Sequence, residues 1–587
     1  FATVALGGFR GLIADVLFLR LQAMQEDDNH FEMVQLGDWI ITLQPFHRDA
    51  IVFLAWNEAY NLSVKFSRHE DRWRWVSSGI EKLRDQGIVY HPDAKMYQQL
   101  GWMYQHKLGQ VLDDANRYYK GQLANQLIEV LGRSARYDWK KYAAAAETES
   151  QFRQVIGRKA FLQHVKKEAI SDDEILTILA RIDTEPGLLD KLAIPDWLED
   201  SILGSKSQEK SKRLEIIFED CGIHSDFYEF LKQKNISYKL FEIQFRAVSA
   251  VAYAKSEKDN MKYLIFPEGY GEALDKMGIL DDTIFHLRRK WLKDEHKLDA
   301  GIIYKMTQKH GYLDIRIPET HAIYWAEQGL LVDDSSVECM RMVFQSMQKM
   351  IMYGRLRAVD SRGFAIVGPN FETFKATEQA YLSAIKKSPK NNGMRSGYEN
   401  YLKDACAMFW VWGLKTEAQS ALDELKSSKK IKLQGGKPFS KRKEYQLSLS
   451  DFAIQLLVED LDDGSDRQML TILMGYATQF HISSVLGEVD RRVAILDMMK
   501  TIYKKYDDSL ENERMKDRKR LPSLHMILIQ AKAMMLVKRD LDPGIKRRLA
   551  QIDPVMGMDK QGNIVNKRGQ IILPAGAGRM KIQRHKH

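Results

Sequence analysis

The sequence predicts an all-α protein: an irregular α-solenoid of helical hairpins, with a helical insertion and a small β-hairpin-like C-terminal tail. Apolar residues recur with the spacing of one helical face through most of the 587 residues. Proline is scarce, and several of its 13 residues stand between periodic segments, at Pro45, Pro92, Pro318 and Pro389. The alternation typical of strands is confined to residues 562–574. Helices that pair and stack account for all three observations.

Composition sets the broad class of the chain. A protein of this length is too long for one core, so it needs either several domains of ~100–200 residues each or a solenoid. Hydrophobic residues make up 44% and charged residues 28%, which is ordinary for a folded soluble protein and excludes wholesale disorder. The three cysteines, Cys221, Cys339 and Cys406, are far apart, and we expect them to be buried apolar residues.

Residues 1–30 are predicted to form a membrane-proximal or packing helix. The first part of this stretch is small and apolar but is interrupted by Arg10, Asp15 and Arg20. Charges at the centre of a spanning helix cost ~2.5–3.5 kcal/mol each, so the stretch does not span a bilayer as written. Because the chain opens on Phe1 rather than Met, we expect an upstream piece. The stretch is then either the continuation of an anchor or an amphipathic helix that packs on the next one.

Residues 31–135 are predicted to form the first helical hairpins. An amphipathic helix over residues 31–43 is followed by a second over residues 50–64, where the small residues Ala55 and Ala59 stand among large ones. We expect these two helices to pair.

The segment 92–109 carries the clearest hairpin pattern. Tyr97, Leu100 and Tyr104 put large side chains on one helical face, and Gly101 stands where a second helix must come close. We expect that second helix to be the next one along the chain, which contains Ala115, Tyr118, Tyr119 and Leu123.

Changes in pattern divide the rest of the chain. Residues 136–312 show helical spacing without the hairpin pattern, and they are predicted to be a helical insertion with a linker near residues 200–210. A second hairpin region is predicted over residues 313–425, with a helix that Thr320 caps and Gly329 ends. The later segments are expected to be a basic loop at 426–446, helices at 447–550, and a basic tail at 551–587 that holds the β-hairpin.

The basic loop has seven lysines, one arginine and no acid between Lys426 and Lys443. Gly435, Gly436 and Pro438 predict that this stretch is flexible. Two interpretations stay open. The loop is either simply solvated or in contact with phosphate groups of lipid or nucleic acid, where each lysine near an anionic membrane surface contributes about 1 kcal/mol.

Two of these patterns are those of a known repeat. The order aromatic, leucine and glycine, aromatic in the segment that begins at Pro92 matches a first repeat helix, while Tyr381, Ala384 and Pro389 match the aromatic, small and closing-proline positions of a second. On these residues the chain resembles a divergent member of the tetratricopeptide-repeat α-solenoid superfamily. The runs from Leu6 to Pro45 and from Leu313 to Gly329 are similar to uncharacterised bacterial proteins with an N-terminal membrane anchor.

The resemblance implies stacked hairpins, a groove that binds a protein or peptide partner, a bacterial source and association with a membrane, on a side that it does not specify. It covers part of the chain. The 34-residue period does not run through, and Ile51 and Glu58 stand where the family usually has aromatic residues.

The sequence lacks the motifs of common catalytic, cofactor and metal sites. There is no His-Glu-x-x-His run, His286 and His296 are ten residues apart, and no Gly-x-Ser-x-Gly elbow occurs. The glycine-rich fragments lack the strand-then-helix setting that lets glycines hold a phosphate. We therefore expect no enzyme activity, no cofactor and no metal.

The sequence favours a non-catalytic scaffold or adaptor that binds a protein or peptide partner in a groove of stacked hairpins. The candidates for contact with that partner are aromatic residues with helical spacing and one histidine: Trp56, Tyr60, Trp73, Tyr97, Trp102, Tyr104, His321 and Trp325. The alternative for each of them is core packing, and for His321 it is a buried ring bonded to a carbonyl.

Two other functions stay open. An enzyme with its active site in the helical middle region would use His321 and Glu319. A nucleic-acid-binding solenoid would need a continuous basic stripe. The net charge of +9 is a mild excess that lies mostly in the basic loop and the tail, so nucleic acid is not expected as a partner.

Overall fold

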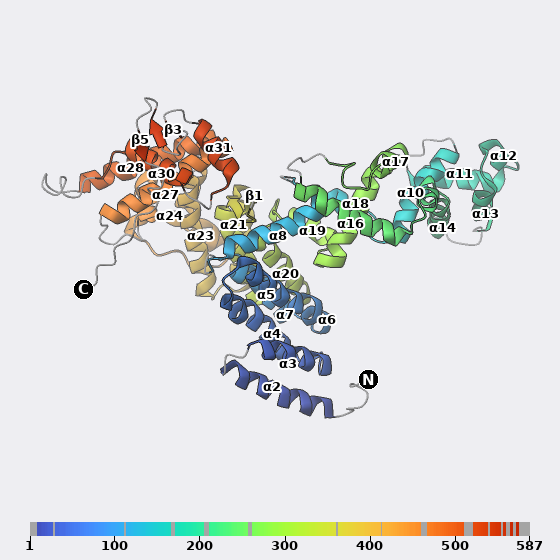
Figure 1. Ribbon diagram of the computed structural model, residues 1–587, viewed down its shortest axis with the longest axis horizontal. Helices are drawn as coiled ribbons and strands as arrows, with labels where there is room; N and C mark the ends of the chain where they lie inside the picture. The colour runs from blue at the N-terminus through green and yellow to red at the C-terminus, as the bar shows by residue number, and fades with distance from the viewer. Residues whose placement is uncertain are drawn as a thin grey trace. The chain divides into compact units, whose positions relative to one another are not determined.

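The chain forms two compact units. The computed structural model describes residues 9–26, 30–110, 113–134, 136–165, 171–204, 210–255, 261–359, 362–411, 414–458, 466–509, 521–537, 541–552, 556–558, 564–566 and 571–573. The first unit runs to Met342 and includes Arg355–Arg357, and the second holds Val343–Gly354 and the chain from Ala358 onward. Helices make up most of both units (Figure 1), which confirms the all-α prediction.

The first unit opens with helices that pack one against the next. In order they are α2 (Arg10–Glu26), α3 (His30–Leu43), α4 (Arg48–Trp56), η2 (Asn57–Leu62), η3 (Ser63–Lys65), α5 (His69–Glu81), η4 (Lys82–Gly87), α6 (Ile88–Tyr90), α7 (Ala94–Trp102), η5 (Met103–Leu108) and α8 (Asn116–Leu131). Helix α2 packs on α3, α3 on α4, and α4 on α5 and η4, in the stack that Figure 1 shows in blue. The predicted pair over residues 31–64 is confirmed.

The small residues Ala55 and Ala59 allow a third helix, α5, to pack closely against this pair. A Cβ atom on Gly79 of α5 would lie 2.5 Å from the carbonyl oxygen of Ala55 and 3.2 Å from the Cβ of Ala59. Ala55 and Ala59 therefore mark the crossing of α5.

Three helices of the stack contain π-helical turns, namely η2, η4 and η5. In η5 the N–H of Gly109 donates to the carbonyl of Tyr104, five residues earlier, at 2.9 Å. Such wide turns are often found at functional sites. Here η2 carries Tyr60, and η5 carries Tyr104 and His106.

The helical insertion follows α8. Its helices are α9 (Trp139–Ala144), α10 (Glu149–His164), α11 (Asp172–Thr184), α12 (Leu188–Leu192), α13 (Asp196–Gly204), α14 (Lys210–Ile223), α15 (Asp226–Gln233), α16 (Tyr238–Lys255), α17 (Tyr270–Lys276), α18 (Leu280–His296) and α19 (Ala300–His310). Helices α16 and α18 pack back on α8, and α19 packs on α9. The predicted linker near 200–210 falls partly on residues 205–209, which lie outside the described residues.

Helices α10 and α14 pack closely because glycines stand at their crossing. A Cβ atom on Gly157 would lie 1.7 Å from the carbonyl oxygen of Phe218, and one on Gly222 would lie 2.2 Å from the carbonyl oxygen of Arg153. Phe161, Ile217 and other apolar side chains of α10, α11, α13 and α14 form a core cluster beside this crossing.

The chain returns from the insertion through α20 (Pro318–Val332), which packs along α7 and η5. A Cβ atom on Gly101 would lie 3.3 Å from the carbonyl oxygen of Ala322 and 2.3 Å from the sulfur of Met342. A second helix does come close at Gly101, as expected. The predicted partner α8, with Tyr118 and Tyr119, contacts η5 at the end of the same segment. The residues nearest to Gly101 are instead Ala322 of α20 and Met342, so the helix that meets the glycine is not the next one along the chain.

The second unit begins within α21 (Val337–Tyr353). It resumes with the last two residues of β1 (Arg355–Val359) and continues through β2 (Ala365–Gly368), η6 (Phe371–Thr373), α22 (Phe374–Lys387), α23 (Asn392–Val411), α24 (Lys415–Ser427), α25 (Lys429–Leu433), η7 (Lys443–Gln446), α26 (Leu449–Val458), α27 (Asp466–Leu486), α28 (Val489–Ser509), α30 (Leu524–Val537) and α31 (Pro543–Ile552). Helices α22 and α23 form a hairpin whose core includes Tyr381, Tyr398 and Tyr401. Tyr381 and Ala384 are buried, as the repeat pattern predicts.

The segment predicted to be a flexible basic loop, 426–446, is instead anchored to the second unit. It contains α25 and η7, and Ile431, Phe439 and Tyr445 are buried. The ammonium of Lys430 lies 2.7 Å from Glu378 of α22. The apolar side chains between the lysines hold the segment in place, which the charge count alone did not reveal.

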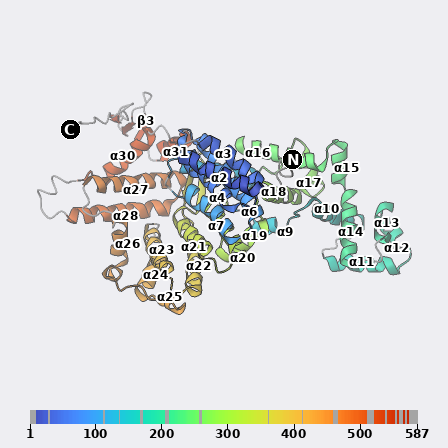
Figure 2. The same cartoon turned by 90° about the horizontal axis from the view of Figure 1, so that it is seen from below.

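Short strands and paired helices complete the second unit. Strands β1 and β2 form a two-stranded sheet that the sequence did not predict. The predicted C-terminal hairpin is confirmed by antiparallel pairing of β4 (Ile564–Asn566) with β5 (Ile571–Leu573), to which β3 (Met556–Met558) adds a third strand. Helices α27 and α28 lie side by side, as Figure 2 shows, and share a core cluster with α30.

Three further features of the structure concern its cysteines, the length and hydropathy of its helices, and groups that could bind a metal. All three cysteines are buried free thiols, as predicted, and burial raises the pKa of Cys221 and of Cys406 to about 12. Among the described residues, no helix is long and apolar enough to cross a membrane. Within the same residues, no group of three or more His, Cys, Asp and Glu side chains is placed to hold a metal ion.

Candidate partner-binding face

Two helices of the first stack begin side by side and position the candidate face. The ring of His47 caps α4 by accepting the N–H of Ala50 at 3.2 Å. The carboxylate of Asp93 caps α7 by accepting the N–H of Met96 at 2.8 Å. The guanidinium of Arg48 lies 3.4 Å from Asp93 and joins the two helix starts.

Four rings from these two helices form a surface that we call the aromatic face: Trp56, Tyr60, Trp102 and His106. Trp56 and Tyr60 stack at 4.7 Å between ring centroids, and Trp102 and His106 stack at 4.9 Å. The hydroxyl of Tyr60 shares a hydrogen bond with Nδ1 of His106 at 3.0 Å. All four residues are half-buried, so each ring is both held by the protein and open to solvent on one side.

Hydrogen bonds fix the orientation of this face. The indole N–H of Trp56 donates to the side-chain carbonyl of Gln99 at 2.9 Å. Burial raises the pKa of Tyr60, and the nearby Trp102 side chain only partly opposes that shift, so the hydroxyl stays protonated at neutral pH.

Two adjoining hollows continue from the aromatic face toward the helix starts. The first has a volume of about 330 Å³ and is lined by Val52, Phe53, Trp56, Met96 and Gln99, among others. The second, of about 510 Å³, has a more polar lining that includes Phe46, His47 and His91. Arg48 and Asp49 line both hollows, so the two are neighbours.

A network of charged side chains lies next to the ring of Tyr60 in the aromatic face. The ammonium of Lys107 lies 5.2 Å from the centre of the Tyr60 ring and 2.8 Å from the carboxylate of Asp113. Asp113 also accepts from Arg72 and from the hydroxyl of Tyr119. Burial alone would raise the pKa of Asp113, but the hydrogen bonds from Lys107 and the N–H of Ala115, with the charges of Lys107 and Arg72, lower it to about 2.

The other predicted contact residues lie elsewhere. Tyr97 is half-buried and stacks on Trp325 at 6.2 Å, on the side of α7 that meets α20. Trp73 of α5 is also half-buried and lies against the ring of Tyr119, at 6.1 Å. Neither residue joins the aromatic face.

Three predicted residues belong to the core between η5 and α20. The exposed fractions of Tyr104, His321 and Trp325 are 5%, 2% and 4%, so their side chains have no surface to offer a partner. Tyr104 and His321 stack at 4.7 Å, and Nε2 of His321 lies 2.8 Å from the carbonyl oxygen of Ile315. Burial lowers the pKa of His321 to about 3, so the ring is neutral. These three residues therefore pack in the core, which was the alternative to contact with a partner.

Two members of the site, His106 and Gln99, are not among the predicted contact residues, because a histidine or glutamine in a helix has no strong signal of its own. Their spacing, however, is a usable signal. Gln99, Trp102 and His106 follow each other at intervals of three and four residues and so share one helical face.

Comparisons with known proteins add little to this description. No protein-family model matches the chain, and no curated protein matches it. Among solved structures, the chain is matched to one chain of "Structure of Naa15/Naa10 bound to HypK-THB", with 12% sequence identity, 92% of this chain and 96% of that chain covered, and a TM-score of 0.17. A TM-score this low establishes no common fold, so the architecture rests on the helices and contacts described above. The resemblance to bacterial membrane-anchored proteins stays a prediction.

Proposed function

We propose that this chain is a non-catalytic scaffold that binds a peptide segment of a partner protein along the aromatic face and its two hollows. The observation that carries the proposal is the row of half-buried rings, Trp56, Tyr60, Trp102 and His106, beside two neighbouring hollows. Rings of this kind supply large contact areas, and their fixed hydrogen bonds lower the entropy lost on binding.

The lining of the hollows indicates the chemistry of the partner segment. Val52, Phe53 and Met96 offer an apolar floor near Trp56, which suits an aliphatic or aromatic anchor side chain. Arg48, Asp49 and Lys95 bring charges of both signs to its edge. An apolar anchor flanked by polar or charged residues of either sign is therefore the expected ligand.

The packing of the middle region supports this proposal over an active site near His321. A catalytic base must lie within hydrogen-bond reach of its substrate. The ring of His321 is instead enclosed by Tyr104 and the carbonyl of Ile315. The nucleic-acid alternative gains no support from the aromatic face either, because Arg48 and Lys107 are paired with carboxylates there.

Peptides selected from a random displayed library against the full chain test the proposal. We expect the selected peptides to share an apolar anchor and Trp56→Ala to raise the Kd of the best one by about 30-fold, since an aromatic residue at the centre of an interface contributes ~2 kcal/mol or more. Fluorescence anisotropy gives the Kd.

Trp75→Ala is the matched control, because Trp75 is also half-buried but stacks on Phe66, away from the aromatic face. Its Kd should stay within about twofold of the unchanged chain. Selection of no peptide, or an equal loss of affinity in both variants, would remove the proposed function.

We further propose that α2 contacts a lipid surface. Leu12, Val16 and Leu19 of α2, with Phe9 directly before it, follow one helical stripe and are 58% to 70% exposed. The opposite side of α2 packs on α3 through residues such as Ala14 and Leu21. A helix packed on one side and apolar on the other suits partial insertion at the interface of a bilayer.

Cosedimentation with vesicles of phosphatidylcholine and phosphatidylglycerol tests this contact. We expect Leu12→Glu to weaken vesicle binding by about tenfold or more, because it removes a leucine from the apolar stripe and adds a charge that lipid disfavours. The matched control is Leu331→Glu on α20, whose leucine is 77% exposed. If the unchanged chain stays in the supernatant, or if both variants bind equally, α2 has no such role.

A further inference from the structure

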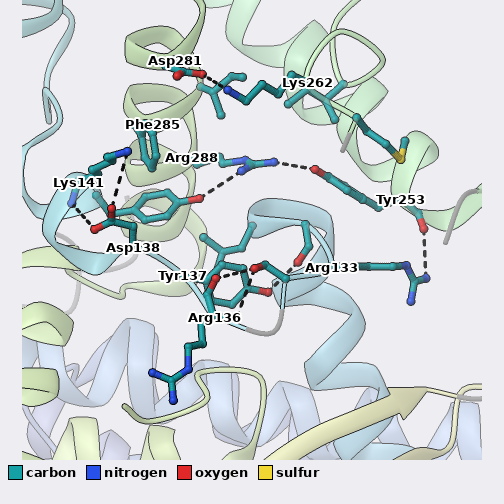
Figure 3. A pocket seen from close by; sticks show the side chains of 17 residues that line it. Arg133, Arg136, Tyr137, Asp138, Lys141, Tyr253, Lys262, Asp281, Phe285 and Arg288 are labelled. Atoms are coloured by element: carbon teal, nitrogen blue, oxygen red, sulfur yellow. Dashed lines mark hydrogen bonds and ion pairs between the residues drawn. The ribbon is translucent and has the colours of Figure 1, made fainter. Parts of the chain in front are cut away.

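A cavity of about 260 Å³ lies inside the first unit, away from the aromatic face. Its walls come from the end of α8, the segment that leads into α9, the last turns of α16, and α18. Figure 3 shows Arg288 of α18 at its centre, with Lys141 and Asp138 on one side and Tyr253 on the other.

The lining of this cavity carries an excess of positive charge. It contains five basic and two acidic side chains, a net charge of +3. Both acids are already paired: Asp281 lies 2.6 Å from the ammonium of Lys262, and Asp138 lies 3.8 Å from that of Lys141. Arg133 and Arg288 contribute to this excess.

Arg288 is held by neutral groups. Its guanidinium donates to the hydroxyl of Tyr253 at 2.7 Å and to that of Tyr142 at 3.2 Å. Among the described residues, no carboxylate lies within ion-pair distance of Arg288 or of Arg133, which donates to the carbonyl of Tyr253 at 3.2 Å. The Nε atoms of both arginines are buried without an acceptor. Arg288 is half-buried, and a partly desolvated cation in this setting lacks the counter-charge that normally offsets its desolvation.

The neighbouring arginine shows what a completed pairing looks like in this fold. Arg289, one residue further along α18, lies 2.9 Å from the carboxylate of Glu147. Arg246 of α16 likewise meets Asp294 at 2.9 Å and Glu295 at 2.7 Å. Arg288 differs from both in facing a cavity instead of a carboxylate.

We propose that this cavity binds a small molecule carrying a phosphate monoester, with Arg288 as the central contact. A phosphate monoester carries a charge of about −1.5 to −2 at neutral pH and offers three acceptor oxygens, which match a guanidinium fork and the surplus charge of the lining. The volume is below the ~300–1,000 Å³ of sites for drug-sized ligands, so the rest of the molecule is small. Phe285 and Tyr142 provide an aromatic wall against which it lies.

Titration calorimetry of the full chain with glycerol phosphate tests the proposal, and cosedimentation with phosphatidate vesicles tests whether the same headgroup is recognised on a lipid. We expect binding of glycerol phosphate, and a loss of affinity of about 30-fold or more in Arg288→Gln, as for other truncated partners of a desolvated charge pair. Binding of phosphatidate in addition assigns the headgroup to lipid as well. Binding of glycerol phosphate alone assigns it to a soluble molecule.

Two further variants keep the test independent of folding. Lys141, whose side chain is 66% exposed, sits at the rim, and Lys141→Gln should weaken binding by only about two- to fivefold. Arg246→Gln removes an arginine of α16 that lies outside the cavity and should leave the affinity unchanged. The proposal is overturned if glycerol phosphate does not bind, if succinate binds as tightly, or if Arg246→Gln weakens binding as much as Arg288→Gln.

Discussion

Replacing Asp314 with alanine is expected to lower the free energy of unfolding of the first unit by about 3–5 kcal/mol, the usual effect of removing one partner from a buried ion pair. Asp314 and Arg316 are 1% and 7% exposed. The Nε and Nη2 atoms of Arg316 donate to the two oxygens of Asp314 at 2.8 Å and 2.9 Å. The same carboxylate accepts the N–H of Leu356 at 2.9 Å.

The expected loss of stability comes from the charge of Arg316, which would stay buried without its partner. Burial alone lowers the pKa of Arg316, but the hydrogen bonds and the charge of Asp314 outweigh burial and raise it, so the arginine stays protonated. Without Asp314, the guanidinium would remain buried beside the ring of Tyr137, 5.6 Å away, without the carboxylate that it now bonds.

A double variant separates this cause from a simple loss of packing. Asp314→Leu combined with Arg316→Met removes both charges, and we expect it to be more stable than Asp314→Ala by several kcal/mol, on the order of what apolar replacement of buried ion pairs has given. Urea denaturation followed by circular dichroism measures each variant. If Asp314→Ala unfolds at the same urea concentration as the unchanged chain, the carboxylate does not have the role assigned to it.

The second large effect is expected at the crossing of α10 and α14. Gly157→Ala should lower the stability of the insertion by about 3 kcal/mol, at the upper end of the range for overpacked cores, because the new methyl would meet backbone atoms, which cannot rotate away. Its nearest neighbour would be the carbonyl oxygen of Phe218, 1.7 Å from the added Cβ, followed by the N of Gly222 at 2.6 Å. The two helices would have to separate.

Hydrogen exchange with mass spectrometry can localise that change. We expect peptides of α10 and α14 to exchange faster in Gly157→Ala, whereas peptides of α7 and α20 should be unaffected. Gly204→Ala is the control, because a Cβ atom there would have no other atom within 4 Å. Equal exchange in the two variants would mean that the crossing tolerates a side chain.

Much of the helical framework could be predicted from spacing, but not the choice of partners. The pattern in α7 correctly indicated that a helix comes close at Gly101. Spacing says which face of a helix is covered and not which segment covers it, so the nearest helix in the chain was assigned in place of α20. The same limit applies to Ala55 and Ala59, whose spacing does not reveal that α5 crosses them.

The aromatic residues show a similar limit at the site. Trp56 and Trp325 give the same signal in the sequence, yet one stands at the surface and the other in the core. Burial is decided by α20, which arrives from far along the chain and covers Tyr104 but not His106. The π-helical turns that carry Tyr60 and His106 have no sequence signature that we recognise.

The return of the chain through α20 also has a consequence for biosynthesis. The side chain of Gln105 bonds the carbonyl of Met342, 237 residues further on. At ~5–20 residues per second, a ribosome needs roughly 10–50 s to make the intervening chain, and during that time the side of α7 that packs on α20 stays uncovered. The nascent protein therefore exposes an apolar helix surface for long enough to be bound by chaperones. Its first unit can complete folding only after the whole insertion has been translated.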